Sequence, residues 1–236
     1  MAETLEIPAH FNGPPGSANG GYTCGRVATL LGGGPAEVTL RSPPPLDTPL
    51  EIRRDGDALA LLDGERLVAD GGPATLEMEV PAPVAPSEAA RASAAGYERW
   101  SGSHPFPSCV VCGPERGEGD GMRVFPGELG DGRFAAGWTP HESLTDDDGL
   151  VPAEIVWAAL DCPTSAPVVN FGQGPPCVLG RLTAAVDAPV VAGRPHALVS
   201  WPIETDGRKR HSGVALFDEQ GRVLARARAL WIEVRE

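Results

Sequence analysis

The sequence predicts an α+β protein made of two similar halves, each combining one long helix with an antiparallel sheet. Residues 58–80 and 213–234 both contain an apolar run ending in Asp, a polar turn with glycine, and a second run ending in Glu-Val. Two strand-like segments flanking such a turn indicate a β-hairpin. Because the pattern occurs once in each half, we interpret it as an internal repeat.

The segments that precede each hairpin extend the match. Residues 36–52 and 178–191 are strand-like, with prolines at edges or turns. A helix is expected before each of them, from about Asn19 to Leu31 in the first half and over 151–162 in the second, where Pro152 suits the first turn. Apolar residues recur at helical spacing along the second helix: Ala153, Val156, Trp157 and Leu160. Each half therefore has the order helix, strand, strand, hairpin.

The segment between the halves has a different character. It begins with several prolines and continues with an Ala-rich stretch from Ser87 to Trp100, which fits a short helix capped by Ser87. We interpret 85–107 as a linker between an N-terminal unit, 1–84, and a C-terminal unit, 108–236. Two such units in one chain imitate a homodimer, and this arrangement places a site at their shared interface.

Charge and composition restrict the partners. The chain has 19 basic and 32 acidic residues and a net charge of −13, and such a surface repels nucleic-acid phosphates and anionic lipids. No stretch approaches the roughly 20 apolar residues of a membrane span, and the N-terminus lacks a signal-peptide pattern. An odd number of irregularly spaced cysteines argues against a disulfide framework. We expect a cytoplasmic protein that binds neither nucleic acid nor membranes.

Cys109 and Cys112, in SCVVCGP, have three interpretations: half of a zinc site, a redox pair, or a tight turn. Zinc needs four ligands, and only His104 lies nearby in the sequence, because the other three cysteines show no partner spacing. With Cys109, Cys112 and His104 as three ligands, a fourth would have to come from folding. A redox pair usually opens a helix, whereas Gly113-Pro114 and further glycines favour a turn. We predict a structural turn without a metal.

Three stretches resemble acyl-CoA thioesterase-like proteins of the hot-dog superfamily. SANGGY (17–22) is similar to the Gly-Gly turn that opens the helix in hot-dog thioesterases. CVVCGPERGEGDGMRV (109–124) is similar to a segment that opens a hot-dog unit, and GLVPAEIVWAALDCP (149–163) with GRLTAAVDAPV (180–190) resembles the central helix and first long strand. The resemblance spans most of the chain except 85–107.

The resemblance implies a fold and an activity. The fold would be a tandem, or double, hot-dog, with two units that each wrap an antiparallel sheet around a long helix. The activity would be hydrolysis of an acyl-CoA thioester, with no cofactor apart from the coenzyme A of the substrate. Hot-dog units often associate further, so a homodimer is also expected.

Thioester hydrolysis needs donors that hold the developing oxyanion. Asn19, Gly20 and Gly21 open the first helix, where backbone N–H groups and the helix dipole favour a negative oxygen, and glycines let a substrate approach closely. The alternative interpretation is that Gly20 and Gly21 only allow tight packing of the helix start.

The reaction also needs a group that activates water. Asp161 falls near the end of the apolar second helix, where desolvation raises the pKa of an unpaired carboxyl. By the resemblance it occupies the position of the catalytic acid, although a capping role beside Pro163 is an alternative. Glu154, on about the same helical face, is the reserve acid, unless it simply complements the helix dipole.

The remaining candidates would bind the ligand. Trp157 and Tyr22 would line an acyl slot, although tryptophans mostly pack the core. The densest basic run, Arg208, Lys209 and Arg210, suits the phosphates of coenzyme A, although a solvated turn is the commoner explanation.

The two helices differ in what they supply. The first has the Gly-Gly turn but no acid at its end, and the second has the acid but no Gly-Gly turn. A complete site must therefore be composite, with residues from both halves. The same mismatch also fits a non-catalytic protein that binds an acyl-CoA or another apolar ligand.

Overall fold

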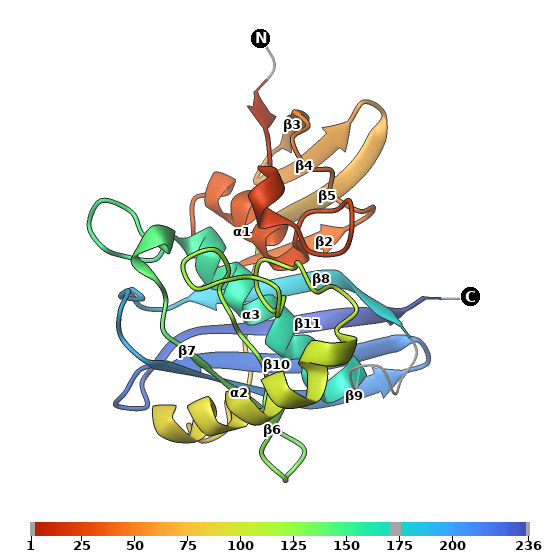
Figure 1. The fold of residues 1–236 in the computed structure, drawn as a ribbon. Coiled ribbons are helices and arrows are strands. Elements are labelled where there is room, and N and C mark those ends of the chain that lie inside the picture. Colours follow the sequence, from red (N-terminus) through yellow and green to blue (C-terminus); the bar gives the residue numbers. More distant parts are fainter. Residues whose placement is uncertain (1–2, 170–175, 235–236) are drawn as a thin grey trace.

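The computed structural model describes residues 3–169 and 176–234, in which helices pack against a large antiparallel sheet (Figure 1). The helices are α1 (Gly20–Leu30), α2 (Pro86–Trp100) and α3 (Ala153–Val169), and the 3-10 turns are η1 (Ala9–Phe11), η2 (Ser101–Ser103) and η3 (Glu142–Leu144). The strands are β1 (Thr4–Leu5), β2 (Ala36–Leu40), β3 (Leu50–Asp55), β4 (Ala58–Asp63), β5 (Arg66–Pro73), β6 (Gly127–Glu128), β7 (Phe134–Trp138), β8 (Cys177–Val186), β9 (His196–Asp206), β10 (Lys209–Phe217) and β11 (Val223–Glu233). This combination confirms the predicted α+β class.

The same order of helix and strands occurs twice. Across the described residues the strands lie side by side in the order β1-β3-β4-β5-β2-β8-β11-β10-β9-β7-β6. The four strands after α1 are therefore arranged as β2-β5-β4-β3, and the four after α3 as β8-β11-β10-β9. The first strands of the two sets pair with each other, with Val38 opposite Leu182, so the sheet continues from one half of the chain into the other.

The first hairpin is shorter than its sequence pattern indicates. It consists of β4 and β5, and residues 75–80, which were expected in its second strand, lie outside any strand. Strand β2, the partner of β5, begins at Ala36, which is paired with Pro73. The Ala74 N–H still donates to the Pro35 carbonyl at 3.0 Å, but no strand continues beside residues 75–80, and alternation alone does not make a strand.

Helix α3 is longer than predicted. It continues through Pro163 and Pro167 to Val169, whereas the sequence suggested an end near 162. An interior proline costs about 3 kcal/mol, because it removes a helical hydrogen bond. Burial offsets this cost, since residues on every side of the helix are buried: Ile155 to Ala166 without exception. Asp161 consequently lies within the helix and not near its end.

Helix α2 occupies the segment predicted as a linker. It begins at Pro86 with Ala85 as the N-cap, so the predicted cap at Ser87 is wrong. Proline suits the first helical position because an N–H there has no helical partner to bond. Ala89 of α2 packs in one cluster with Ala135 of β7 and Ala197 of β9.

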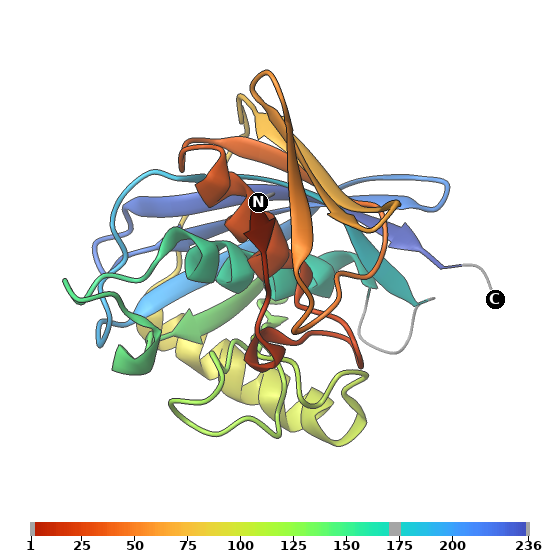
Figure 2. The same ribbon diagram turned by 90° about the horizontal axis from the view of Figure 1, so that it is seen from above.

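The two faces of the sheet bury different helices. Ala135 belongs to the small cluster with α2, whereas Ala136, the next residue, belongs to the main core with α1 and α3. Ala197 and Leu198 divide in the same way. Because successive strand residues point to opposite faces, α2 covers one face of the sheet and α3 the other. Figure 2 shows α1 and α3 together against the curved sheet.

Helices α1 and α3 make the closest contact in the core. A Cβ atom added at Gly25 would lie 2.6 Å from Glu154 Cα and 2.8 Å from Trp157 Cβ. One added at Gly21 would collide with the Cβ of Asp161. Later positions of α1 therefore contact earlier positions of α3, so the two helices are antiparallel. Their backbones come into contact at Gly21 and Gly25, where α1 has no side chain.

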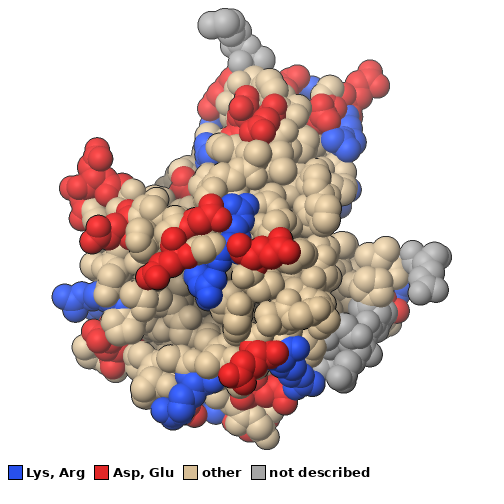
Figure 3. Space-filling view, in the orientation of Figure 1, with Lys and Arg blue, Asp and Glu red and all other residues tan. Residues whose placement is uncertain are grey.

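The outer surface reflects the acidic composition. Figure 3 shows several groups of acidic side chains on one face, with basic side chains interspersed and no continuous basic area. None of the described helices combines the length and the apolar character that crossing a membrane requires.

Gly25→Ala tests the helix contact. The added methyl group overlaps Glu154 and Trp157, so we expect a net loss of about 1–3 kcal/mol in the free energy of unfolding, despite the better helix propensity of alanine. The measurement is urea denaturation. Gly34→Ala is the matched control, because an added Cβ there meets no atom within 4 Å, and it should change stability by less than about 0.5 kcal/mol. A Gly25→Ala protein as stable as the control would contradict the packing.

Candidate active site between helices α1 and α3

Asn19 caps α1 and also reaches α3. Its Oδ1 accepts a hydrogen bond from the Tyr22 N–H at 2.8 Å, which satisfies one of the unpaired donors of the first turn. Its Nδ2 donates to Asp161 Oδ2 at 3.1 Å. The Asn19 N–H in turn donates to the Phe11 carbonyl at 2.8 Å, which holds the cap in place. The side chain thus joins the start of one helix to the middle of the other.

Asp161 receives a second hydrogen bond from α1. The Gly21 N–H donates to the same oxygen, Oδ2, at 2.9 Å. The absence of a side chain at Gly21 lets α3 approach to this distance. The other carboxyl oxygen, Oδ1, is buried and has no hydrogen-bond partner among the described residues. The predicted residues Asn19, Gly21 and Asp161 therefore meet, and they come from different halves of the chain.

The environment of Asp161 raises its pKa to about 7. Burial is the largest cause, because the side chain is only 4% exposed and its charged form loses hydration. The Gly21 N–H opposes the shift, the charge of Cys109 adds to it, and Asn19 opposes it. The carboxyl therefore exists in both protonation states near neutral pH.

Gly20 provides the backbone donor next to the carboxyl. It is partly exposed, and an added Cβ would lie 2.9 Å from Leu179 Cδ2 and 3.1 Å from Leu40 Cδ1. Among the described residues its N–H has no recorded acceptor, whereas the Gly21 N–H is used by Asp161. Sequence reasoning missed Leu40 and Leu179, because only the pairing of β2 with β8 brings these strands to the start of α1.

Glu154 lies at the other end of the helix contact. Its carboxylate is 3.9 Å from Arg26 Nε, and it accepts a hydrogen bond from Thr29 Oγ1 at 3.3 Å. Both partners are on α1, near Gly25 and away from Gly21. The structure therefore separates the two candidate acids: Glu154 is paired with a cation, and Asp161 is held by neutral donors.

The two candidate aromatic residues are mainly packing residues in this conformation. Trp157 is 2% exposed and lies against Gly25. Tyr22 stacks on Phe11 with ring centroids 3.8 Å apart, and its hydroxyl accepts a hydrogen bond from Arg26 at 3.3 Å. Burial raises the pKa of Tyr22. Both rings flank the contact that holds Asp161, and their predicted role as an acyl slot stays a prediction.

The basic run lies at the end of the sheet that approaches α3. Arg208 Nη1 donates to the Glu233 carbonyl at 3.1 Å, and Arg210 Nη2 donates to the Glu233 carboxylate at 2.8 Å. Ser212, two residues after Arg210, donates through Oγ to the Thr164 carbonyl at 2.7 Å. Thr164 is about one helical turn beyond Asp161. Both arginines of the run are therefore held by Glu233, Lys209 is exposed, and Ser212 is the residue of this strand end that contacts α3.

Three cysteines gather beside the carboxyl. The sulfur atoms of Cys109, Cys112 and Cys162 lie within 4.8 Å of one another, and all three residues are buried. Cys162 directly follows Asp161 on α3. Folding thus supplies the third cysteine that spacing alone did not. In the part of the chain that the structure describes, this is the group of side chains best suited to hold a metal ion.

The described conformation encloses Asp161. A cleft of about 540 Å³ lies elsewhere, where Met122 and Arg123 face the end of β7 and His141. None of the predicted site residues lines it. Beside the buried Asn19, Gly21 and Asp161, Gly20 is partly exposed.

Comparison with known proteins identifies the fold. No family model and no curated protein matches the sequence. A conserved protein of unknown function with a hot-dog fold from Alicyclobacillus acidocaldarius has a TM-score of 0.64 at 13% identity, and covers 99% of this chain and 93% of its own. The chain has the hot-dog fold.

Two further solved structures agree. The tesB protein of Mycobacterium avium subs paratuberculosis has a TM-score of 0.63 at 13% identity, with 98% of this chain and 91% of the other covered. A putative thioesterase from Novosphingobium aromaticivorans has a TM-score of 0.60 at 14% identity, with 98% and 95% covered. At such identities the likeness establishes the hot-dog arrangement, and the chemistry has to be argued from the residues of this chain.

Asp161→Asn tests the buried carboxyl. Because the pKa of about 7 lies above the unfolded value near 4, ionisation opposes folding, and the wild type loses stability relative to the variant as the pH rises through 7. We expect the difference in unfolding free energy to change by on the order of 2–4 kcal/mol between pH 4 and pH 8. Urea denaturation in EDTA-containing buffers measures it. Asp57→Asn, at an exposed turn, is the control, and an equal change for both variants would contradict the assignment.

Proposed function

We propose that the chain hydrolyses the thioester bond of an acyl-CoA at a site between α1 and α3. One observation carries the proposal: Asn19 and Gly21 hold one oxygen of Asp161 and leave the other oxygen without a partner. A carboxyl fixed at a helix N-terminus beside a glycine amide has the parts that water activation and oxyanion stabilisation need. The hot-dog fold, shared with a putative thioesterase, supports this choice.

The proposal includes the organisation of the chain. Residues 1–84 and 108–236 would each be a hot-dog unit, and 85–107, with α2, would connect them. The repeated strand order and the pairing of β2 with β8 support this division. The site would then be composite, since its amides come from the first unit and its carboxyl from the second.

In the proposed reaction Asp161 would act first as a general base and then as a general acid. Asp161 Oδ1 takes a proton from a water molecule, whose oxygen attacks the thioester carbonyl carbon. The carbonyl oxygen becomes an oxyanion and accepts the Gly20 N–H at the positive end of α1. The tetrahedral intermediate then breaks its carbon–sulfur bond, and the departing thiolate takes the proton from Asp161. Leu40 and Leu179 flank Gly20 and would contact the acyl chain.

A panel of acyl-CoA esters tests the activity, with release of free thiol as the readout. We expect turnover by the wild type and a loss of about 10²–10⁴-fold in kcat/KM for Asp161→Asn, the usual contribution of a general base. Asp57→Asn should keep the wild-type rate. Failure to cleave any ester, or full activity of Asp161→Asn, would reject the mechanism.

Glu154→Gln distinguishes the two acids in the same assay. Because Glu154 is engaged by Arg26 and Thr29, its loss should affect stability more than the rate. A large loss of kcat in Glu154→Gln together with an active Asp161→Asn would reverse the assignment.

A separate prediction concerns the role of the basic run in binding coenzyme A. If Arg208 and Lys209 contact the phosphates of coenzyme A, the double substitution to Ala should raise KM several-fold and leave kcat unchanged, because the lost contact is equal in ground and transition states. Arg222, exposed and paired with Asp218 on another turn, is the control position. An unchanged KM would remove the run from the ligand site.

The enclosure of Asp161 favours a second candidate function, binding without turnover. The side chain is 4% exposed, and a protein that only holds an acyl-CoA or an apolar ligand needs no access of water to it. Isothermal titration calorimetry would then show saturable binding of the same esters, with no release of thiol.

A further inference from the structure

The cysteine cluster joins parts of the chain that are distant in sequence. Cys109 and Cys112 belong to the segment that follows α2, and Cys162 belongs to α3, the central helix. Three sulfur atoms bound to one zinc ion at about 2.3 Å each lie about 3.8 Å apart. The observed separations, all within 4.8 Å, are therefore reached with shifts of an ångström or less.

Backbone hydrogen bonds and Gly113 define the turn that carries Cys109 and Cys112. The Gly113 N–H donates to the Cys109 carbonyl at 2.8 Å and closes the turn. An added Cβ at Gly113 would lie 2.5 Å from the carbonyl oxygens of Cys109 and Pro107, so the turn accepts only glycine here. The Val110 N–H donates to the Asn12 carbonyl at 2.9 Å, which ties the turn to the rest of the protein.

Cys109 Sγ is surrounded by donors. The thiols of Cys112 and Cys162 donate to it, as do the backbone N–H groups of Cys112 and Val111. Backbone donors that converge on one sulfur stabilise a thiolate, the form that binds metals.

A dry cluster of thiols is the simpler alternative, since buried cysteines are common in cores. That alternative explains the burial of each residue. It does not explain why three sulfur atoms from two distant segments lie together, or why backbone N–H groups donate to one of them. Cys24 is also fully buried near Asp161 and stands outside the cluster, so burial alone does not gather the cysteines.

We propose that Cys109, Cys112 and Cys162 bind one zinc ion that fastens the turn after α2 to helix α3. Zinc is the fitting ion, because it favours tetrahedral sites with several thiolate ligands and has no redox chemistry. Binding releases the thiol protons of the ligands to solvent. The site is independent of the proposed hydrolase activity, since none of its ligands takes part in that reaction.

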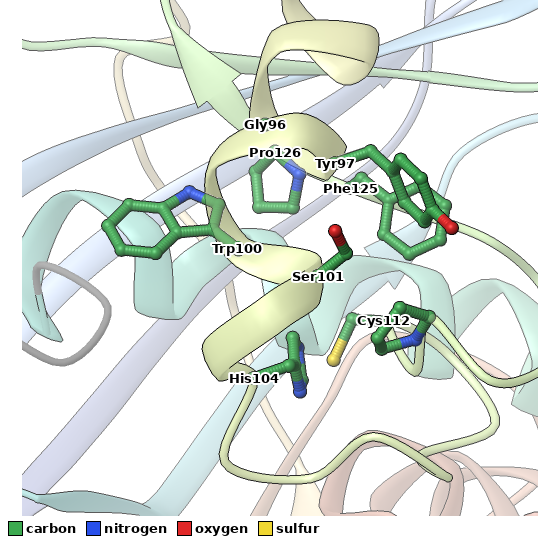
Figure 4. A pocket seen from close by; sticks show the side chains of 9 residues that line it. Gly96, Tyr97, Trp100, Ser101, His104, Cys112, Phe125 and Pro126 are labelled. Carbon is green, nitrogen blue, oxygen red and sulfur yellow. The ribbon is translucent and has the colours of Figure 1, made fainter.

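A small pocket lies beside the cluster and shares Cys112 with it. It is lined by the end of α2, by His104 and by Cys112 (Figure 4). The ring of His104 and the sulfur of Cys112 both point toward this pocket. Three thiolates leave one position of a tetrahedral ion, and this side of the cluster admits either the imidazole or a water molecule to fill it.

The test uses the full chain, purified with a reductant and freed of metal by a chelator. Zinc chloride alone is then added, and bound zinc is counted by mass spectrometry after gel filtration. We expect one zinc ion per chain and a higher melting temperature. Cobalt(II) in place of zinc should give an intense thiolate-to-cobalt charge-transfer band, which reports sulfur ligands in the wild type without any substitution.

Cysteine variants provide the matched comparison. Cys162→Ser and Cys109→Ser should lose stoichiometric zinc and the cobalt band, while Cys24→Ser, an equally buried cysteine, should keep both. Because Cys162→Ser changes a helix in the core, Cys109→Ser in the turn gives a second variant if the first does not fold. A folded, reduced wild type that binds neither ion would overturn the proposal. So would a Cys109–Cys112 disulfide in the native protein, or loss of zinc from Cys24→Ser alone.

Discussion

Helix α1 approaches α3 so closely that two of its contact positions carry no side chain. Gly21 and Gly25 let the backbones meet, and the two helices together fill the space inside the curved sheet. A helix that is buried on all sides tolerates two internal prolines, because apolar burial outweighs two lost hydrogen bonds. The positions of Asp161, Glu154 and Trp157 relative to α1 follow from this contact.

The contact also explains why a charged residue is found in the core. The start of α1 has N–H groups without helical partners, and Asp161 accepts one of them together with the amide of Asn19. The carboxyl thus replaces water as a partner for the helix terminus, but only through one of its oxygens. The remaining oxygen keeps the cost of burial, which is the reason for its raised pKa.

Glu154, the second acid at the same interface, has different hydrogen-bond and charge partners from Asp161. Glu154 lies beside Gly25, where Arg26 and Thr29 can reach it. Glu154 thus has a cation beside it, whereas Asp161 is held by neutral donors. The single crossing of α1 and α3 therefore holds its two acids in different settings, Asp161 beside Gly21 and Glu154 beside Gly25. The neighbouring Cys162 adds a third kind of contact, since it turns away from α1 toward the cysteines of the long connecting segment.

The sequence by itself determined the elements that depend on local pattern. Helical spacing marked the second central helix, the paired hairpin patterns marked the repeat, and the Asn19-Gly20-Gly21 cap and Asp161 were singled out as site candidates. Local rules failed where the outcome depended on neighbours: the helix continued past Pro163, and residues 75–80 lacked a partner strand. Only the tertiary structure decided that Gly21 holds Asp161, that Arg26 holds Glu154, and that Cys162 joins Cys109. These contacts link residues that are far apart in the chain, and neither periodicity nor spacing carries information about which distant backbones can approach closely enough to touch.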